Sequence, residues 1–228
     1  MKKNKLITGI VLNIVNIIFI VTCSIFSLTG LNWMGIGGRL TPDSTNLFSL
    51  FTVDSNILLG ICSVIILVYE FLLLKGKIEK IPLFAFILKY IATSAVALTF
   101  LTILLVFVPM MKENFWQMYT NNNLFFHLIC PVIAIVSLLV AEHTSELKFK
   151  HTFFGLAPAG IYAIYYSINV LIHMNPDGTV DTKYDPYYFA QNGWGGIIFS
   201  FVGMLVFAYI ISFLLFLFSS LIAKKERV

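Results

Sequence analysis

The chain has 228 residues, of which 59% are apolar, 15% aromatic and only 11% charged, with a net charge of +4. Soluble domains carry about a quarter charged residues. The composition therefore excludes an ordinary soluble domain and indicates an integral membrane protein.

Six apolar stretches follow one another along the chain. Each is long enough to cross a bilayer as a helix, which takes about 20 residues. They use most of the sequence and show no internal repeat, so we expect an all-α polytopic membrane protein, a six-transmembrane-helix bundle forming one transmembrane domain over residues 1–228. The predicted spans are about 6–29, 47–74, 83–109, 123–141, 152–173 and 196–222.

The positive charges lie mainly at one side of these spans. Of the 15 Lys and Arg residues, eleven fall at the two ends of the chain and in the loops 75–82 and 142–151. Cytoplasmic loops carry the excess of Lys and Arg, so both termini are expected in the cytoplasm, as an even number of spans requires. We expect a multi-pass protein of the plasma membrane, in a bacterium the cytoplasmic membrane.

Four polar side chains interrupt the start of the second span, in the stretch "LFSLFTVDSNILLGI" of residues 47–61. Thr52, Ser55 and Asn56 are spaced by three and four residues, which places them on one helix face, whereas Asp54 points away. An unpaired polar group at membrane depth is costly. These side chains are therefore expected to face other polar groups or a wet cavity.

Polar groups of two other spans reach the same level. Thr52 lies about 7 to 8 Å inside the outer surface, and His127 enters the fourth span at nearly equal depth. Pro131 has no N–H for the carbonyl of His127, so we expect the helix to be distorted at the histidine. The fifth span carries a polar and aromatic stripe that can line the same cavity: Tyr162, Tyr166, Asn169 and His173.

Thr52 and His127 are a possible catalytic pair. A threonine hydroxyl becomes a nucleophile when a base removes its proton, and neutral histidine is the usual base near pH 7. The expected reaction is hydrolysis of an acyl ester within the bilayer. Helical backbone N–H groups are expected to be engaged, so the candidates for substrate binding or for stabilising the oxyanion are side chains: Ser55, Asn56, Tyr166, Asn169 and His173.

Other interpretations of these residues remain open. Thr and Asn side chains also join membrane helices without any catalytic role. Cys130 shares the face of His127 and offers another nucleophile. Zinc could be held by His127, His173, Asp54 and Cys130, but no metal-binding spacing supports this, and we expect neither a metal nor another cofactor.

Two further charged residues lie within the spans. Glu70 and Lys89 lie toward the cytoplasmic ends of their spans, where they can pair or Lys89 can snorkel to the surface.

Two other function classes are compatible with these residues. The polar cluster around Thr52 could instead be the binding site of a small transporter or channel. A non-catalytic membrane scaffold is a third interpretation.

The segments "FTVDSN", "FFHLICP" and "DPYYF" together resemble the androgen-induced-gene type and androgen-dependent TFPI-regulating protein family of six-span membrane proteins. The resemblance covers most of the chain, and Asn56 matches the bacterial pattern rather than the animal one. It implies a threonine hydrolase that cleaves fatty acid esters of hydroxy fatty acids, with Thr52 as nucleophile and His127 as base. The implied partner is a lipid substrate from the bilayer, with no nucleic acid; oligomeric state is left open.

Overall fold

A computed structural model of the protein describes residues 3–35, 47–144 and 146–225. Helices account for all the regular elements of these residues, and no β-strand is found among them. The six spans predicted from the sequence are confirmed as helices long and apolar enough to cross a membrane. They are Lys3–Thr29, Phe51–Leu74, Leu83–Tyr119, Asn122–Ala141, Phe149–Ile172 and Phe189–Lys225.

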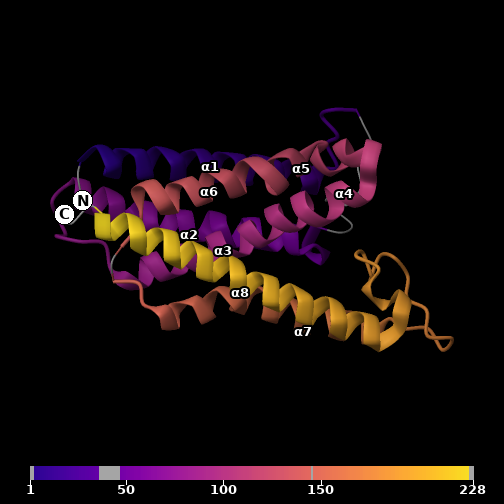
Figure 1. The fold of residues 1–228 in the computed structure, drawn as a ribbon. Coiled ribbons are helices and arrows are strands. Elements are labelled where there is room, and N and C mark those ends of the chain that lie inside the picture. Colours follow the sequence, from indigo (N-terminus) through magenta and orange to yellow (C-terminus); the bar gives the residue numbers. More distant parts are fainter. Residues whose placement is uncertain (1–2, 36–46, 145, 226–228) are drawn as a thin grey trace.

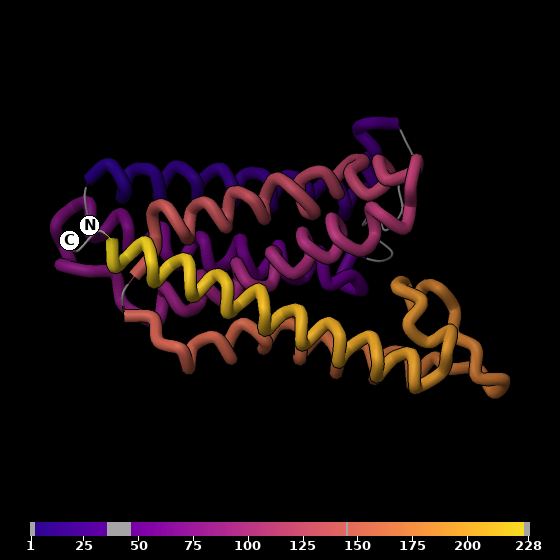
Figure 2. Tube along the Cα trace, in the orientation of Figure 1, coloured from indigo at the N-terminus to yellow at the C-terminus, as the bar shows by residue number. Residues whose placement is uncertain are grey.

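Two groups of helices make up the bundle (Figure 1). The first group packs α1 on α2, α2 on α3, and α6 on both α1 and α3; the second packs α7 and α8 beside α3. Both ends of the chain lie at the same end of the bundle, which Figure 2 also shows. The helices of these two groups are α1 (Lys3–Thr29), α2 (Phe51–Leu74), α3 (Leu83–Thr102), α6 (Cys130–Val136), α7 (Ala157–Ile172) and α8 (Gly193–Lys225).

The outward faces of these helices carry large apolar side chains. Phe199 of α8 is 82% exposed, and Ile172 of α7 is 69% exposed. Large exposed apolar surfaces are unfavourable in water, whereas the apolar tails of lipids can pack against them. The protein is therefore a multi-pass membrane protein, and the choice of membrane remains a prediction.

Wide turns interrupt the third and fourth spans. Pro131 follows the π-helical turn Phe125–Ile129, and Pro109 follows the π-helical turn Ile103–Phe107. Since proline cannot donate the usual backbone hydrogen bond, the helix before it widens. The distortion expected at His127 is thus present as a π-helical turn.

The remaining short elements complete these two spans and begin the others. The third span continues through α4 (Val108–Met111) and the 3-10 turn Lys112–Tyr119. The fourth span consists of α5 (Asn122–Leu124), the π turn Phe125–Ile129, α6 and the π turn Ser137–Ala141. The other 3-10 turns are Leu47–Ser49, Phe149–Leu156 and Phe189–Asn192.

Two predicted boundaries differ from the structure in ways that affect the site. The second span was expected from residue 47, but α2 begins at Phe51, because Leu50 is extended and separates it from the turn Leu47–Ser49. The third span was expected to end at 109 and continues to Tyr119. Hydropathy identifies apolar runs, but it does not show at which residue within such a run a helix begins or ends.

Candidate functional site

Thr52 and His127 meet at the end of the bundle opposite the chain termini. Thr52 is the second residue of α2, and His127 lies in the middle of the π turn Phe125–Ile129. The Thr52 Oγ1 atom is 3.4 Å from His127 Nε2. The threonine is 7% exposed and the histidine 1%. The structure therefore brings together the two side chains that the sequence selected.

The other nitrogen of His127 fixes the tautomer of the ring. His127 Nδ1 lies 2.6 Å from the main-chain oxygen of Met118. A carbonyl oxygen only accepts, so Nδ1 carries the hydrogen of the neutral imidazole and Nε2 keeps a free lone pair. That lone pair faces the Thr52 hydroxyl, which is the arrangement a general base requires.

Ser55 and Asn56 hold the pair in place. The Asn56 amide donates to the carbonyl of Thr52 at 2.7 Å and to that of Phe126 at 3.1 Å. Both of its hydrogens are thus engaged, so Asn56 is not placed to donate to an oxyanion. Ser55 Oγ donates to the carbonyl of Thr52 at 3.0 Å and lies 3.2 Å from the Thr99 hydroxyl. Both side chains hold the backbone that carries Thr52.

Three residues expected from the fifth span anchor the following loop instead of lining the site. Tyr166 donates to Asp185, and the Asn169 amide donates to the carbonyl of Tyr184 at 3.1 Å. The His173 ring stacks on Tyr184 with centroids 3.5 Å apart. Their side chains are therefore used by the loop 173–188, which the stripe on α7 did not reveal.

An apolar cavity of about 660 Å³ opens beside Thr52. Its volume falls in the range of ordinary small-molecule sites. Leu105 and Met110 line its outer edge and are 58% and 72% exposed, so the cavity opens toward lipid. The polar groups on its wall include Thr52, Thr99, Thr102, Tyr162, Tyr187 and Ser200.

Tyr187 is a site residue that residue spacing did not identify. The backbone N–H of Phe51 donates to its hydroxyl oxygen at 3.1 Å, and the hydroxyl also interacts with the side chains of Thr52 and Tyr162. Burial raises the pKa of Tyr187 to about 12, so the phenol keeps its hydrogen near pH 7. Its segment, "DPYYF", lies in a loop, and the spacing of residues along a loop does not show where the loop returns.

The start of α2 supplies a second hydrogen-bond donor near the Thr52 hydroxyl, in addition to the hydroxyl of Tyr187. The first N–H groups of a helix have no acceptor within it, and Thr52 is the second residue of α2. The Thr52 N–H therefore has no acceptor within α2, which a helix beginning at residue 47 would have given it.

The other candidate residues lie apart from the pair. Cys130 is fully buried in an apolar cluster with Leu59 and Val96. Asp54 is half-buried and does not line the cavity. Within the ranges 3–35, 47–144 and 146–225, no three His, Cys, Asp or Glu residues are grouped so that they could hold a metal ion.

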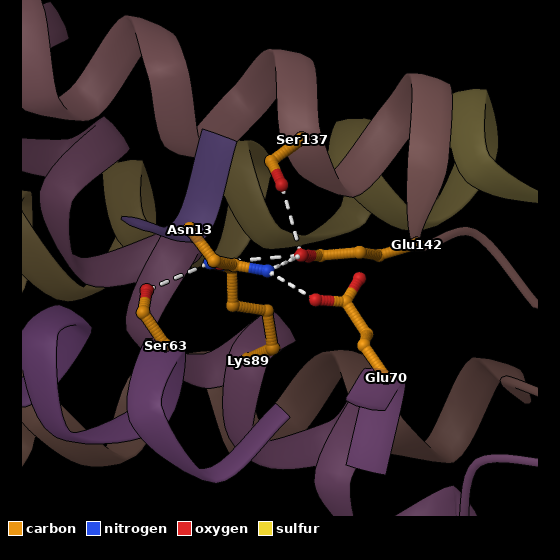
Figure 3. Close-up of polar contacts among 6 residues, drawn as sticks. All are labelled: Asn13, Ser63, Glu70, Lys89, Ser137 and Glu142. Carbon is orange, nitrogen blue, oxygen red and sulfur yellow. Dashed lines mark hydrogen bonds and ion pairs between the residues drawn. The ribbon is translucent and has the colours of Figure 1, made fainter. Parts of the chain in front are cut away.

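A second polar cluster lies nearer the chain termini (Figure 3). Lys89 is fully buried, so it does not snorkel, and its Nζ atom lies 3.9 Å from the carboxylate of Glu142. Glu70 instead accepts from the amide of Asn13 at 3.0 Å. The sequence suggested a pair of charges here, and the structure adds a third charge, that of Glu142.

An apolar layer separates the two polar regions. On α2, Leu59 and Cys62 lie between Asn56 and Ser63, and on α3, Val96 lies between Lys89 and Thr99. The layer consists of Ile20, Leu59, Cys62, Ala92, Val96, Cys130 and Ala134. Buried polar side chains also occur near this level, at Asn16 on α1 and Thr93 on α3, so the layer separates the two polar regions only in part.

The fold and the site define a polytopic α-helical membrane protein in which a Thr–His pair adjoins an apolar cavity. No family model, curated protein or solved structure matches the chain.

Proposed function

We propose that the protein is an intramembrane lipid esterase, with Thr52 as nucleophile and His127 as general base. The observation that carries the proposal is the 3.4 Å approach of Thr52 Oγ1 to His127 Nε2 beside an apolar cavity. Hydrogen bonds between catalytic groups are often long before substrate binds and shorten in the reacting complex. The resemblance noted in the sequence points to the same two residues.

The first half of the reaction forms an acyl-threonine. His127 Nε2 takes the hydroxyl proton of Thr52 as Oγ1 bonds to the ester carbonyl carbon. The tetrahedral intermediate then breaks its bond to the alcohol oxygen, which leaves with the proton from Nε2. The carbonyl of Met118 holds Nδ1–H throughout and so keeps the ring in position.

In the second half, water releases the acyl group. His127 takes a proton from the water, whose oxygen bonds to the acyl carbon, and the proton then passes to Thr52 Oγ1 as the acyl bond breaks. The products are a carboxylic acid and the free threonine. We expect two donors to stabilise the oxyanion of both intermediates, namely the Tyr187 hydroxyl and the backbone N–H of Thr52.

The cavity favours an ester with a long apolar chain. Its wall is built chiefly of side chains such as Leu98, Val106, Met204 and Phe207, and it opens to lipid rather than only to water. A fatty-acyl ester, such as a fatty acid ester of a hydroxy fatty acid, would enter sideways from the outer leaflet. Transport by the same polar cluster is the less favoured function, because the apolar side chains of Leu59, Val96 and Cys130 lie between the two polar regions.

The test is ester turnover by the purified protein in lipid nanodiscs. Thr52→Ala and His127→Ala should each abolish hydrolysis of a fluorogenic long-chain acyl ester, while Thr52→Ser should retain part of it. Thr8→Ala is a matched control, because Thr8 is exposed on α1 and bonds only within its own helix. Folded Thr52→Ala protein with full activity would refute the proposal.

The modified residue can also be identified directly. A fluorophosphonate probe should label Thr52, as mapped by peptide mass spectrometry, and the label should be lost in Thr52→Ala. Labelling at Cys130 or Ser55 would assign the nucleophile to another residue. Solute flux in liposomes without ester turnover would favour the transporter instead.

A further inference from the structure

The buried charges near the chain termini form a compact network that the proposed esterase does not use (Figure 3). The Asn13 amide donates to Glu142 at 2.5 Å and to Glu70 at 3.0 Å, and Lys89 donates to the side-chain oxygen of Asn13. Lys89 also donates to Ser63 at 2.9 Å. These side chains come from α1, α2, α3 and the residue after the fourth span.

The network is closed to solvent, and its formal charges do not balance. Glu70 and Lys89 are 0% exposed and Glu142 is 1% exposed. Two carboxylates and one ammonium leave one uncompensated negative charge. An uncompensated charge away from water costs several kcal/mol, so a further positive charge is needed.

Within the part of the chain that the structure describes, the charged groups that act on Glu70 and Lys89 do not supply it. Glu70 faces the charges of Glu142 and Lys89, and Lys89 additionally faces the thiol of Cys62. His143 follows Glu142 outside the span, where burial and Lys5 lower the pKa of its ring. His143 is therefore neutral near pH 7.

Two carboxylate oxygens in the network also lack a hydrogen-bond donor. They are Glu70 Oε1 and Glu142 Oε2, both buried. Each carboxyl group uses its other oxygen, since Asn13 donates to both groups and Ser137 donates to Glu142 at 2.8 Å. A single proton on one of the two carboxyl groups would supply a donor and remove the excess charge.

The space at Glu70 favours a proton over a metal cation. Gly9, one turn before Asn13 on α1, lies against the Glu70 carboxylate, and a Cβ at this glycine would overlap the unpartnered oxygen. The carboxylate is thus pressed against the helix backbone. A metal cation would need several more oxygen ligands around it.

We propose that Glu70, Glu142 and Lys89 form a proton-binding site, in which the two carboxyl groups hold one proton between them. The proton exchanges at the end of the bundle that carries the chain termini, where Glu142 adjoins the loop. This site is separate from the Thr52–His127 pair, and its proof does not depend on the esterase.

Infrared spectroscopy tests the site through the C=O stretch of a protonated carboxylic acid, which carboxylates do not show. The full-length protein in nanodiscs should show this band at neutral pH. Glu70→Gln and Glu142→Gln should each abolish it, because the remaining carboxylate then balances Lys89. Lys89→Met should double it, because both carboxyl groups then take a proton.

Glu146→Gln is the matched control and should leave the band unchanged, since Glu146 is exposed and pairs with Lys80 at 3.1 Å. Size-exclusion profiles and circular dichroism establish that each variant is folded; if Lys89→Met is not, the two glutamine variants still decide. Absence of the band in the wild type, or its survival in both glutamine variants, would overturn the proposal. Stabilisation by added Na⁺ without the band would assign the site to a metal cation.

Discussion

The role given to Tyr187 leads to a prediction for Tyr187→Phe, which removes one oxygen and keeps the ring. That oxygen accepts the N–H of Phe51 at 3.1 Å and contacts Thr52. Losing a single oxyanion donor costs a factor of about 10² to 10³ in kcat. We therefore expect kcat for a long-chain ester to fall by about a hundredfold, or ~2.7 kcal/mol in activation free energy, with little change in KM.

The same substitution should lower stability, because the Phe51 N–H loses its partner. A buried donor left unsatisfied costs about 1 to 3 kcal/mol. Thermal unfolding in detergent measures this loss separately from turnover, so a drop in kcat in protein that is still folded at the assay temperature can be attributed to the site.

Tyr188→Phe is the matched control for both measurements. Tyr188 is the next residue and is 49% exposed, so its hydroxyl is expected to be dispensable. If Tyr187→Phe retained the kcat of Tyr188→Phe, the hydroxyl of Tyr187 would not stabilise the transition state, and the oxyanion site would have to be sought elsewhere.

Three further predictions concern stability. Gly155→Ala should lower the free energy of unfolding by about 1 to 3 kcal/mol, because the new Cβ would lie 2.7 Å from the Cβ of Ser212. Gly160→Ala adds a Cβ that meets open space in α7, so the free energy of unfolding should stay the same or rise by up to ~1 kcal/mol. Asn56→Leu breaks two buried hydrogen bonds and should cost about 1 to 3 kcal/mol by the same measurement while also reducing ester turnover. Folding raises the pKa of Tyr187 from 10.0 to about 12, so the neutral phenol contributes stability that is fully present below about pH 10. This stability should be lost as the pH rises to about 12, and Tyr187→Phe should not show this alkaline loss.

The sequence predicted the features that depend on local pattern. Apolar length gave the six spans, and equal depth in two spans selected Thr52 and His127. Pro131 predicted the distorted helix at the histidine, because a missing N–H acts within one turn.

Features that depend on long-range contacts were not predictable in this way. The role of Tyr187 follows from the path of a loop that returns to the start of α2, and spacing within α7 could not show that Tyr166 and Asn169 hold this loop. Glu142 lay in a segment that reads as a polar loop, yet packing closes over it and places it beside Lys89. Because α2 begins at Phe51 rather than at residue 47, the Thr52 N–H has no acceptor within the helix, and the apolar run alone does not show this.

Two π-helical turns flank α6, and each precedes or contains a key side chain of the fourth span: His127 lies within Phe125–Ile129, and Glu142 directly follows Ser137–Ala141. A π-helical turn holds one residue more than the same turn of α-helix, so removing one residue from either turn would return it to ordinary helix with little rotation of the helix beyond it. At these two turns the fourth span is therefore able to absorb a one-residue deletion that would rotate an ordinary helix by roughly 100°, although a deletion within Phe125–Ile129 would still move the imidazole away from Thr52.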